Sequence, residues 1–324
     1  RKEMTGSLDE VQITGIRDRL AELTALDQRR EAILKSLAER ELLDDALRAA
    51  VVAAETMTAL EDVYLPYRPK RRTRATMARE RGLEPLATLL MAQDRHTDPD
   101  REATRFVDPA NDVPDTDAAL AGARDIIAEQ VSEDPEVRSE LRALFRDRGT
   151  IRSKVRRDKE QVGQKFRDWF DFEEPLARTV SHRVLAMRRG EAEDVLSVRL
   201  TVPEESALHV LERHFLTGRG PASSQVALAV ADGWKRLLSL ALETELRLEL
   251  KKAADTEAIR VFTENLRELL LAAPLGRKAV LALDPGCRTG CKLVVLDPQG
   301  ALLHHDTVYP HTGGDRVHTA AATV

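Results

Sequence analysis

A carboxylate followed by a glycine turn, near residue 284, has the residue types of a metal-dependent site. The apolar residues 279–283 have the length of a buried strand, and Asp284 and Gly286 come directly after them. A carboxylate at the end of a first buried strand can help to bind Mg²⁺, which aligns a water molecule against a phosphodiester. Arg288 and Lys292, in and after the following loop, offer positive charge to a phosphate. These residues predict either a phosphate-related site or a structural aspartate at a strand end.

Two-metal hydrolysis needs further carboxylates from later strands and a later helix, and such elements do not follow Asp284 within the 324 residues. Cys287 and Cys291 are separated by three residues and lack a second pair, so they do not form a zinc site. His304 and His305 lie on an expected strand, where neighbouring side chains point to opposite faces. We therefore expect Asp284 to be non-catalytic, and we expect no metal and no cofactor.

A basic segment stiffened by two prolines is the second chemical feature. Pro66 and Pro69 restrict the residues before them to extended geometry, so residues 62–74 are expected to form an extended strap. This strap carries Arg68, Lys70, Arg71, Arg72 and Arg74. A row of cations on an extended chain can follow a phosphate backbone, and arginine binds phosphate bidentately. The segment predicts nucleic-acid contact; the alternative is a solvated loop paired with acidic neighbours.

A second basic run covers residues 144–168, which contain nine Lys or Arg and four Asp or Glu. Trp169, Phe170 and Phe172 follow at once. Basic residues next to aromatic residues are compatible with nucleic-acid contact. Aromatic residues after a helix usually anchor it in a core, however, and we favour that role for Trp169 and Phe170. The charges themselves could equally form a solvated helix face.

Composition limits the class of protein. The 324 residues include 50 basic and 55 acidic residues, a net charge of −5, and only 4% are aromatic. Abundant Leu, Ala, Glu and Arg favour helices, and the length suggests about two domains. No run of about 18 apolar residues is present, so no membrane span is expected. Two cysteines cannot build a secreted disulfide framework, so we expect a cytoplasmic protein.

The positioning elements are mostly helical. A capping-box pattern begins at Ser7, and helices are expected over about 10–26, 27–40 and 42–60, with their apolar stripes packed in a core. Residues 94–117 are rich in Asp, Pro and Thr and predict a flexible surface loop. Further helices are expected over 118–145 and 205–215, and from Ser223 or Ser224 to Leu271 with a break near Asp255.

Strands are expected at 195–200 and in the last part of the chain. Residues 279–283, 291–296 and 301–309 have the pattern of three strands, and the turn after Asp297 has proline second and glycine fourth. This strand, loop, strand, turn, strand order is the opening meander of an α/β domain.

The sequence resembles the Tex family of bacterial transcription accessory proteins. The resemblance runs in order along the chain to about His311, after which the sequence departs from the family pattern. Its most specific motif is Tyr64-Leu65-Pro66-Tyr67-Arg68-Pro69-Lys70-Arg71-Arg72-Thr73-Arg74-Ala75. Other motifs are Gly82-Leu83-Glu84-Pro85-Leu86-Ala87, Trp234-Lys235-Arg236-Leu237-Leu238 and Leu283-Asp284-Pro285-Gly286.

The resemblance implies a mainly α protein. Residues 1–275 would form a multi-helical N-terminal region with a helix-turn-helix-like part, and residues 276–324 the first strands of an α/β ribonuclease-H-like domain of the YqgF type, truncated. Asp284 matches the first carboxylate of that domain, which in this family is regarded as lacking a full catalytic set. Helix-hairpin-helix elements and an OB-fold RNA-binding domain follow in the full family.

The function implied is that of a non-enzymatic, nucleic-acid-binding transcription accessory protein. It would contact RNA or DNA without sequence specificity, through Arg68, Lys70, Arg71, Arg72, Arg74, Arg288 and Lys292, and would also meet RNA polymerase or elongation factors. One alternative is a metal-dependent nuclease or resolvase that uses Asp284. Another is a protein-interaction scaffold that does not touch nucleic acid.

Overall fold

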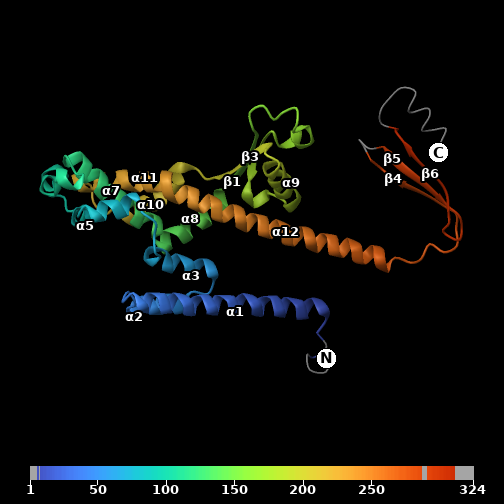
Figure 1. Ribbon diagram of the computed structural model, residues 1–324, viewed down its shortest axis with the longest axis horizontal. Helices are drawn as coiled ribbons and strands as arrows, with labels where there is room; N and C mark the ends of the chain where they lie inside the picture. The colour runs from blue at the N-terminus through green and yellow to red at the C-terminus, as the bar shows by residue number, and fades with distance from the viewer. Residues whose placement is uncertain (1–5, 7, 287–289, 311–324) are drawn as a thin grey trace. The chain divides into compact units, whose positions relative to one another are not determined.

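A side-chain cap fixes the start of the first helix. Asp9 accepts a hydrogen bond from the Gln12 backbone N–H at 2.8 Å, and the Gln12 side chain accepts one from the Asp9 N–H at 3.0 Å. The computed structural model describes residues 6, 8–286 and 290–310, so the cap expected at Ser7 lies outside the described residues. Helix α1 then continues through Glu10–Glu39 without the expected division near residue 26 (Figure 1).

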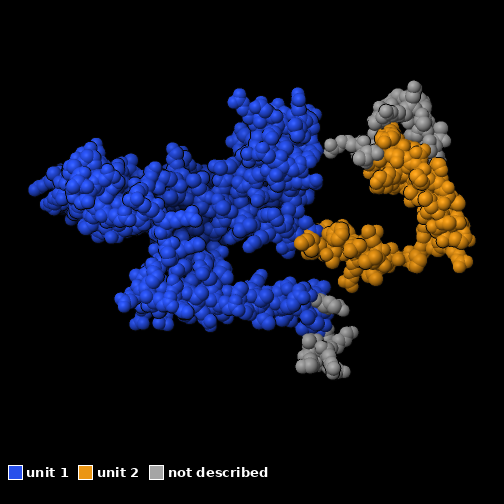
Figure 2. All heavy atoms as spheres, viewed as in Figure 1, with its two compact units in different colours: residues 1–258 blue, residues 259–324 orange. Residues whose placement is uncertain are grey.

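The chain divides into two units, residues 1–258 and 259–324, which are described separately (Figure 2). In the first unit α1 is followed by α2 (Asp45–Ala53), α3 (Met57–Tyr64) and a 3₁₀ turn, η1 (Leu65–Tyr67). The single helix expected over 42–60 is therefore two helices. Thr56 lies between the two helices and caps α3, because its side chain accepts a hydrogen bond from the N–H of Ala59.

A small apolar core joins these helices. It contains Leu26, Ile33, Leu37, Leu47, Val51, Ala54, Leu60 and Tyr64. The N-terminal half of α1 takes no part in it, because Val11 and Leu20 are 73% and 63% exposed. The expectation that the first apolar stripe packs in a core is therefore wrong for this half of the helix.

The rest of the first unit is a helical body. Its helices are α4 (Arg74–Glu80), α5 (Glu84–Ala92), α6 (Pro99–Ala103), α7 (Thr116–Glu133), α8 (Pro135–Arg148), α9 (Ser181–Ala192), α10 (Glu204–Phe215), α11 (Pro221–Gly233) and the part of α12 (Ser239–Leu271) up to residue 258. A π-helical turn, η6 (Trp234–Leu238), joins α11 to α12, and the break expected near Asp255 is not present. Short 3₁₀ turns are η2 (Thr104–Phe106), η3 (Pro109–Asn111), η4 (Gln164–Trp169) and η5 (Leu176–Arg178).

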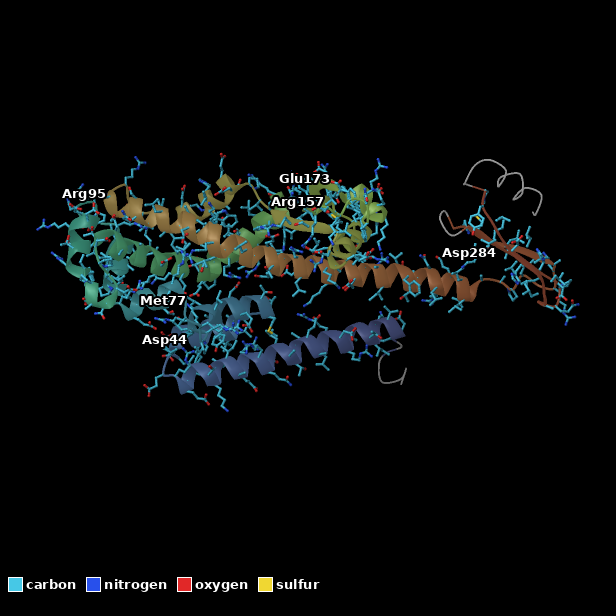
Figure 3. The ribbon with its side chains drawn as sticks, turned by 45° about the horizontal axis from the view of Figure 1, so that its top comes forward. Asp44, Met77, Arg95, Arg157, Glu173 and Asp284 are labelled. Atoms are coloured by element: carbon cyan, nitrogen blue, oxygen red, sulfur yellow. The ribbon has the colours of Figure 1, made fainter. Side chains whose placement is uncertain are left out.

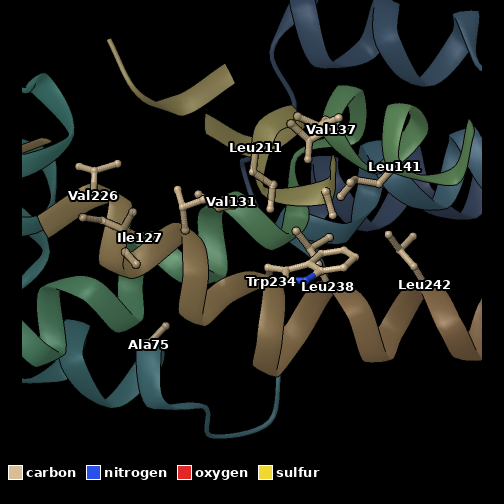
Figure 4. Close-up of a cluster of buried hydrophobic side chains, with 14 of the residues drawn as sticks. Ala75, Ile127, Val131, Val137, Leu141, Leu211, Val226, Trp234, Leu238 and Leu242 are labelled. Atoms are coloured by element: carbon tan, nitrogen blue, oxygen red, sulfur yellow. The ribbon is translucent and has the colours of Figure 1, made fainter. Parts of the chain in front are cut away.

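Helix α7 lies at the centre of the main core. Ile126, Ile127 and Val131 are fully buried, and they belong to one cluster with Trp234 and Leu238 from the π turn (Figure 4). An α-helix with buried residues on most of its surface is an internal element and not an amphipathic surface helix. The body is thus organised around α7.

Residues 94–117 differ from the flexible loop that was expected. They contain α6, η2 and η3, and they bury Ala103 and Val113. Asp98 caps α6 and Asp115 caps α7 through hydrogen bonds to backbone N–H groups. Aspartate and proline are typical of turns but also of helix starts, and here the second role applies.

A three-stranded antiparallel sheet interrupts the helices, with strand order β2-β1-β3. Its strands are β1 (Thr150–Val155), β2 (Asp171–Pro175) and β3 (Leu196–Thr201). Only β3 was expected; β1 and β2 come from the basic run and the aromatic residues after it. Trp169, Phe170 and Phe172 pack against the main core, as expected for Trp169 and Phe170.

The second unit contains the expected meander, with β4 (Val280–Asp284), β5 (Cys291–Leu296) and β6 (Leu302–Val308) in antiparallel order β4-β5-β6. Asp297 accepts hydrogen bonds from the N–H groups of Gln299 and Ala301, and Gly300 has φ of +83°, which glycine adopts without strain. The prediction of a mainly α chain followed by short strands is confirmed. Among the described residues, the helices are too short or too polar to cross a bilayer.

We predict that Ile126→Ala destabilises the body by about 2–5 kcal/mol, because it leaves a cavity in the fully buried centre of α7. Leu228→Ala on α11 is the control, since Leu228 is 56% exposed and its truncation should cost less than about 0.5 kcal/mol. Urea unfolding followed by circular dichroism measures both. Equal midpoints for the two variants would contradict the central position of α7.

Candidate nucleic-acid interface

The basic proline segment is mostly not extended. Asp62 lies within α3, the next residues form η1, and α4 already begins at Arg74. Only residues 68–73 are irregular; together with Arg74, the first residue of α4, they form the segment that we call the connector (residues 68–74). The expected strap over 62–74 is therefore shorter than predicted, because Pro66 sits in the first turn of a 3₁₀ helix, where its fixed φ is tolerated.

The connector is fastened to α7 by two buried carboxylates. The Lys70 ammonium lies 3.1 Å from Glu129 and 2.7 Å from Glu133. Thr73 donates a hydrogen bond to Glu129 at 2.9 Å, and Arg79 of α4 donates another at 2.7 Å. The Glu129 side chain is only 8% exposed, so its charge must be balanced inside the protein.

The Lys70 ammonium is therefore already paired within the protein, and its expected contact with phosphate stays a prediction. No local pattern in the sequence indicates this pairing. The two carboxylates lie 59 and 63 residues further along the chain, and only the fold brings them to Lys70.

Burial raises the pKa of these carboxyl groups, whereas ion pairing lowers it. Burial alone would raise the pKa of Glu129, but hydrogen bonds from Arg79 and Lys70 outweigh it and hold that pKa below its usual value. For Glu133 burial prevails over Lys70 and raises the pKa. Ionised Glu129 therefore adds stability above the usual glutamate pKa, and this contribution disappears as the pH falls through its lowered value.

The other connector cations are exposed. Among the described residues, no carboxylate lies within ion-pairing distance of Arg68, Arg71 or Arg74. Arg72 lies 3.6 Å from Glu80, but both side chains are more than 60% exposed, so the pair is weak. Four guanidinium groups on a short, anchored segment are thus available to a polyanion.

An open hollow of about 360 Å³ lies between the connector, α7 and the π turn. The basic side chains that line it are Arg68, Lys70, Arg71, Arg74 and Arg236. Arg236 is already paired with Asp125 at 2.8 Å, and burial raises the pKa of that carboxyl group despite the pairing. The carboxylates of Asp125, Glu129 and Glu133 line the same hollow, so the arginines stand beside a concave surface of mixed charge.

The second basic run is partly paired with carboxylates in the fold. Arg152 pairs with Glu173 of β2 at 3.5 Å, and Arg156 pairs with Asp194 at 3.0 Å. Of the nine cations in residues 144–168, those with a carboxylate partner are Arg146, Arg148, Arg152, Arg156, Arg157, Lys159 and Lys165. Glu173 and Arg157 both lie at the small sheet (Figure 3). The local excess of positive charge in the sequence therefore does not give an equally basic surface.

Asp284 ends β4 in the second unit (Figure 3). Its side chain is 76% exposed, and the Lys292 ammonium lies 3.8 Å away on the neighbouring strand. Lys292 is thus a partner of Asp284, and Arg288 lies outside the described residues. In the part of the chain that the structure describes, no three His, Cys, Asp or Glu side chains are grouped so that they could hold a metal ion.

Three protein-family models match the chain. The "Tex-like protein N-terminal domain" matches residues 1–38, the "Tex central region-like" model matches residues 94–262, and the "Tex protein YqgF-like domain" matches residues 278–324. The last match continues past His311, where we expected the sequence to depart from the family pattern, so that expectation is corrected. Residues 311–324 themselves lie outside the described residues.

Curated relatives cover nearly the whole chain. It is 44% identical to "Protein YhgF" of Escherichia coli over 97% of this chain and 42% of that protein. It is 41% identical to the "Transcriptional accessory protein Tex" of Neisseria gonorrhoeae over 100% of this chain and 43% of that protein. It is 27% identical to the human "S1 RNA-binding domain-containing protein 1" over 97% of this chain and 33% of that protein. The chain thus spans less than half the length of these relatives.

We predict that Glu129→Gln loosens the connector, because a neutral amide cannot balance Lys70 and Arg79. Losing these two partly buried ion pairs should lower the free energy of unfolding by about 1–3 kcal/mol. Trypsin should cut after the connector's basic residues faster than in the wild type, as measured by mass spectrometry of early fragments. Glu80→Gln is the control because Glu80 forms only an exposed pair. Equal cleavage of the two variants would show that Glu129 does not hold the connector.

Proposed function

This chain belongs to the Tex family, and on that premise we propose that it is a nucleic-acid-binding transcription accessory protein that acts as a scaffold. The observation that carries the proposal is the exposed arginine set of the connector, held by the buried anchor on α7 beside an open hollow. Arginine matches phosphate oxygens with two parallel donors, so a short row of arginines suits a sugar–phosphate backbone.

We propose that the contact is electrostatic and independent of base sequence. Among the described residues, no carboxylate forms an ion pair with Arg68, Arg71 or Arg74, and only Arg74 stands near one, Asp125. The phosphates would therefore meet guanidinium groups without breaking an ion pair. Lys70 serves this contact indirectly, because its anchor restricts the motion of the segment that bears the arginines. Phosphate contacts of this kind position a nucleic acid but do not read its sequence.

The names of two relatives support the proposal. One is called a transcriptional accessory protein, and the human relative is named for an RNA-binding domain. Because the chain spans less than half of each relative, binding to RNA or DNA, contact with RNA polymerase or elongation factors, and a cytoplasmic location are all proposals for this chain.

A protein-interaction scaffold is the second candidate, and exposed apolar side chains favour it. Val11, Ile16 and Leu20 are 57–73% exposed on α1, and Phe262 and Leu269 are 66% and 74% exposed on α12. Binding of nucleic acid in a purified system separates this candidate from the first, because a scaffold without nucleic-acid contact would not bind there.

We predict that replacing Arg68, Arg71, Arg72 and Arg74 together by alanine weakens binding to single- and double-stranded oligonucleotides. The slope of log affinity against log salt should flatten by about 0.7–0.9 for each phosphate that the variant no longer neutralises. Fluorescence anisotropy over a series of salt concentrations measures both quantities.

The matched control replaces Arg17, Arg19, Arg146 and Arg189 by alanine. These four side chains are 63–73% exposed and each is paired with a carboxylate, so the net charge changes equally. The control should keep the wild-type salt slope. If both quadruple variants show the same fall in affinity and slope, net charge rather than the connector governs binding.

We predict that the chain does not cut nucleic acid. Incubation with Mg²⁺ and labelled oligonucleotides should give the same product yield for the wild type and for Asp284→Asn. We base this on the exposed carboxylate of Asp284, whose neighbouring cation is the Lys292 ammonium. Cleavage that requires both Mg²⁺ and Asp284 would favour the nuclease alternative.

A further inference from the structure

The first unit contains two separate apolar cores. All buried members of the small core lie between Leu26 and Tyr64, and all those of the main core lie between Ala75 and Leu246. We call residues 10–67, which comprise α1, α2, α3 and η1, the N-terminal bundle. The connector is its covalent link to the body, and its other contacts with the body are those of η1 with α7 and of α3 with α8.

The bundle meets the body through charges. Asp62 of α3, which is 5% exposed, accepts hydrogen bonds from Arg138 and Arg142 of α8, each at 2.7 Å. On the other side the same arginines donate to Glu245 of α12, at 3.0 Å and 2.5 Å. Two guanidinium groups thus lie between one carboxylate of the bundle and one of the body.

The ion pairs within this cluster are mutually dependent. Burial disfavours the charged form of Arg142, but its hydrogen bonds to Asp62 and Glu245 outweigh this effect and raise its pKa above the usual arginine value. Removing one member of a buried charge cluster is costly, because the remaining charges are left without balance. The cluster is therefore strong only while all four groups are in place.

Open space flanks the cluster on both sides. One hollow of about 450 Å³ and another of about 390 Å³ are both lined by Asp62 and Arg142. The charged groups therefore form a contact between two hollows. Separation at this place would expose four charges to water but would open neither apolar core.

We propose that Asp62, Arg138, Arg142 and Glu245 form an ionic latch that docks the N-terminal bundle on the body, and that the start of the connector, before the anchored Lys70, is the hinge about which an undocked bundle moves. Because Arg68 lies on this hinge, docking also sets its position relative to α7. This last consequence rests on the proposed function, whereas the latch itself does not.

Spin-label distance measurements on the full chain test the latch. Labels on cysteines introduced at Lys35 of α1 and Arg189 of α9, both more than 70% exposed, report the distance between bundle and body. The native cysteines are replaced by serine. We expect a single narrow distribution for the wild type and a broad one, shifted to longer distances, for Asp62→Asn.

Glu61→Gln is the matched control. Glu61 is the neighbour of Asp62 and pairs at 2.6 Å with Arg29, so its pair lies wholly within the bundle. We expect this variant to keep the narrow wild-type distribution. If Asp62→Asn also keeps it, the latch proposal is wrong.

Two further label pairs distinguish undocking from unfolding. Labels at Lys35 and Val52 lie within the bundle, and labels at Arg189 and Leu228 lie within the body, all on exposed positions. We expect both distributions to stay unchanged in Asp62→Asn. If the Lys35–Val52 distribution broadens, Glu245→Gln decides, because it weakens the latch from the body side. An unchanged bundle–body distance in Glu245→Gln would then overturn the proposal.

Oligonucleotide affinity of Asp62→Asn tests the link to the proposed function. A broadened distance with a lower affinity supports both the latch and its effect on the connector. A broadened distance with unchanged affinity supports the latch and contradicts its effect on binding. Weaker binding by the connector variant, with an intact distance in Asp62→Asn, would keep the proposed function and reject the latch.

Discussion

A buried carboxylate must be balanced by a cation, and in this chain that requirement decides which basic residues have a structural role. Glu129 and Asp62 are both less than 10% exposed, and each recruits two cationic side chains. The cost of an unbalanced buried charge is large enough to fix these partners in place. The arginines that remain on the connector have no such partner. Their availability follows from the carboxylates being satisfied by Lys70 and Arg79.

Local patterns predicted those parts of the fold that depend on nearby residues. The turn at Asp297, strand β3 and the packing of Trp169 and Phe170 depend on neighbouring residues or on side-chain size. Local patterns gave wrong predictions where contacts between distant parts of the chain determine the structure. Apolar residues at helical spacing, such as Val11 and Leu20, remain exposed because no described element covers them. The Asp and Pro residues of 94–117 mark helix starts as readily as loops, and only the burial of the segment distinguishes the two.

The candidate site illustrates the same limit for charges. Residues 144–168 contain nine basic residues, yet four of those cations pair with carboxylates from β2 and from the turn after α9. Those partners lie up to about 40 residues away, as Arg156 and Asp194 show. The sequence alone identified the basic segments and the motif at residues 64–75. It could not show which charges the fold neutralises, because that depends on long-range contacts.

The two charged contacts of the N-terminal bundle act together. Lys70 fastens the connector to α7, and Asp62 fastens α3 to α8, so two ionic contacts lie where the bundle joins the body, beside the contact of η1 with α7. A contact made by apolar burial would tolerate small shifts, whereas ion pairs with short hydrogen bonds define one geometry. A charged ligand bound to the connector would therefore lie close to the ion pairs of Lys70 and Asp62. The bundle and the body each have an apolar core of their own, and ion pairs link the two parts. The bundle can therefore be positioned without making either core depend on the other.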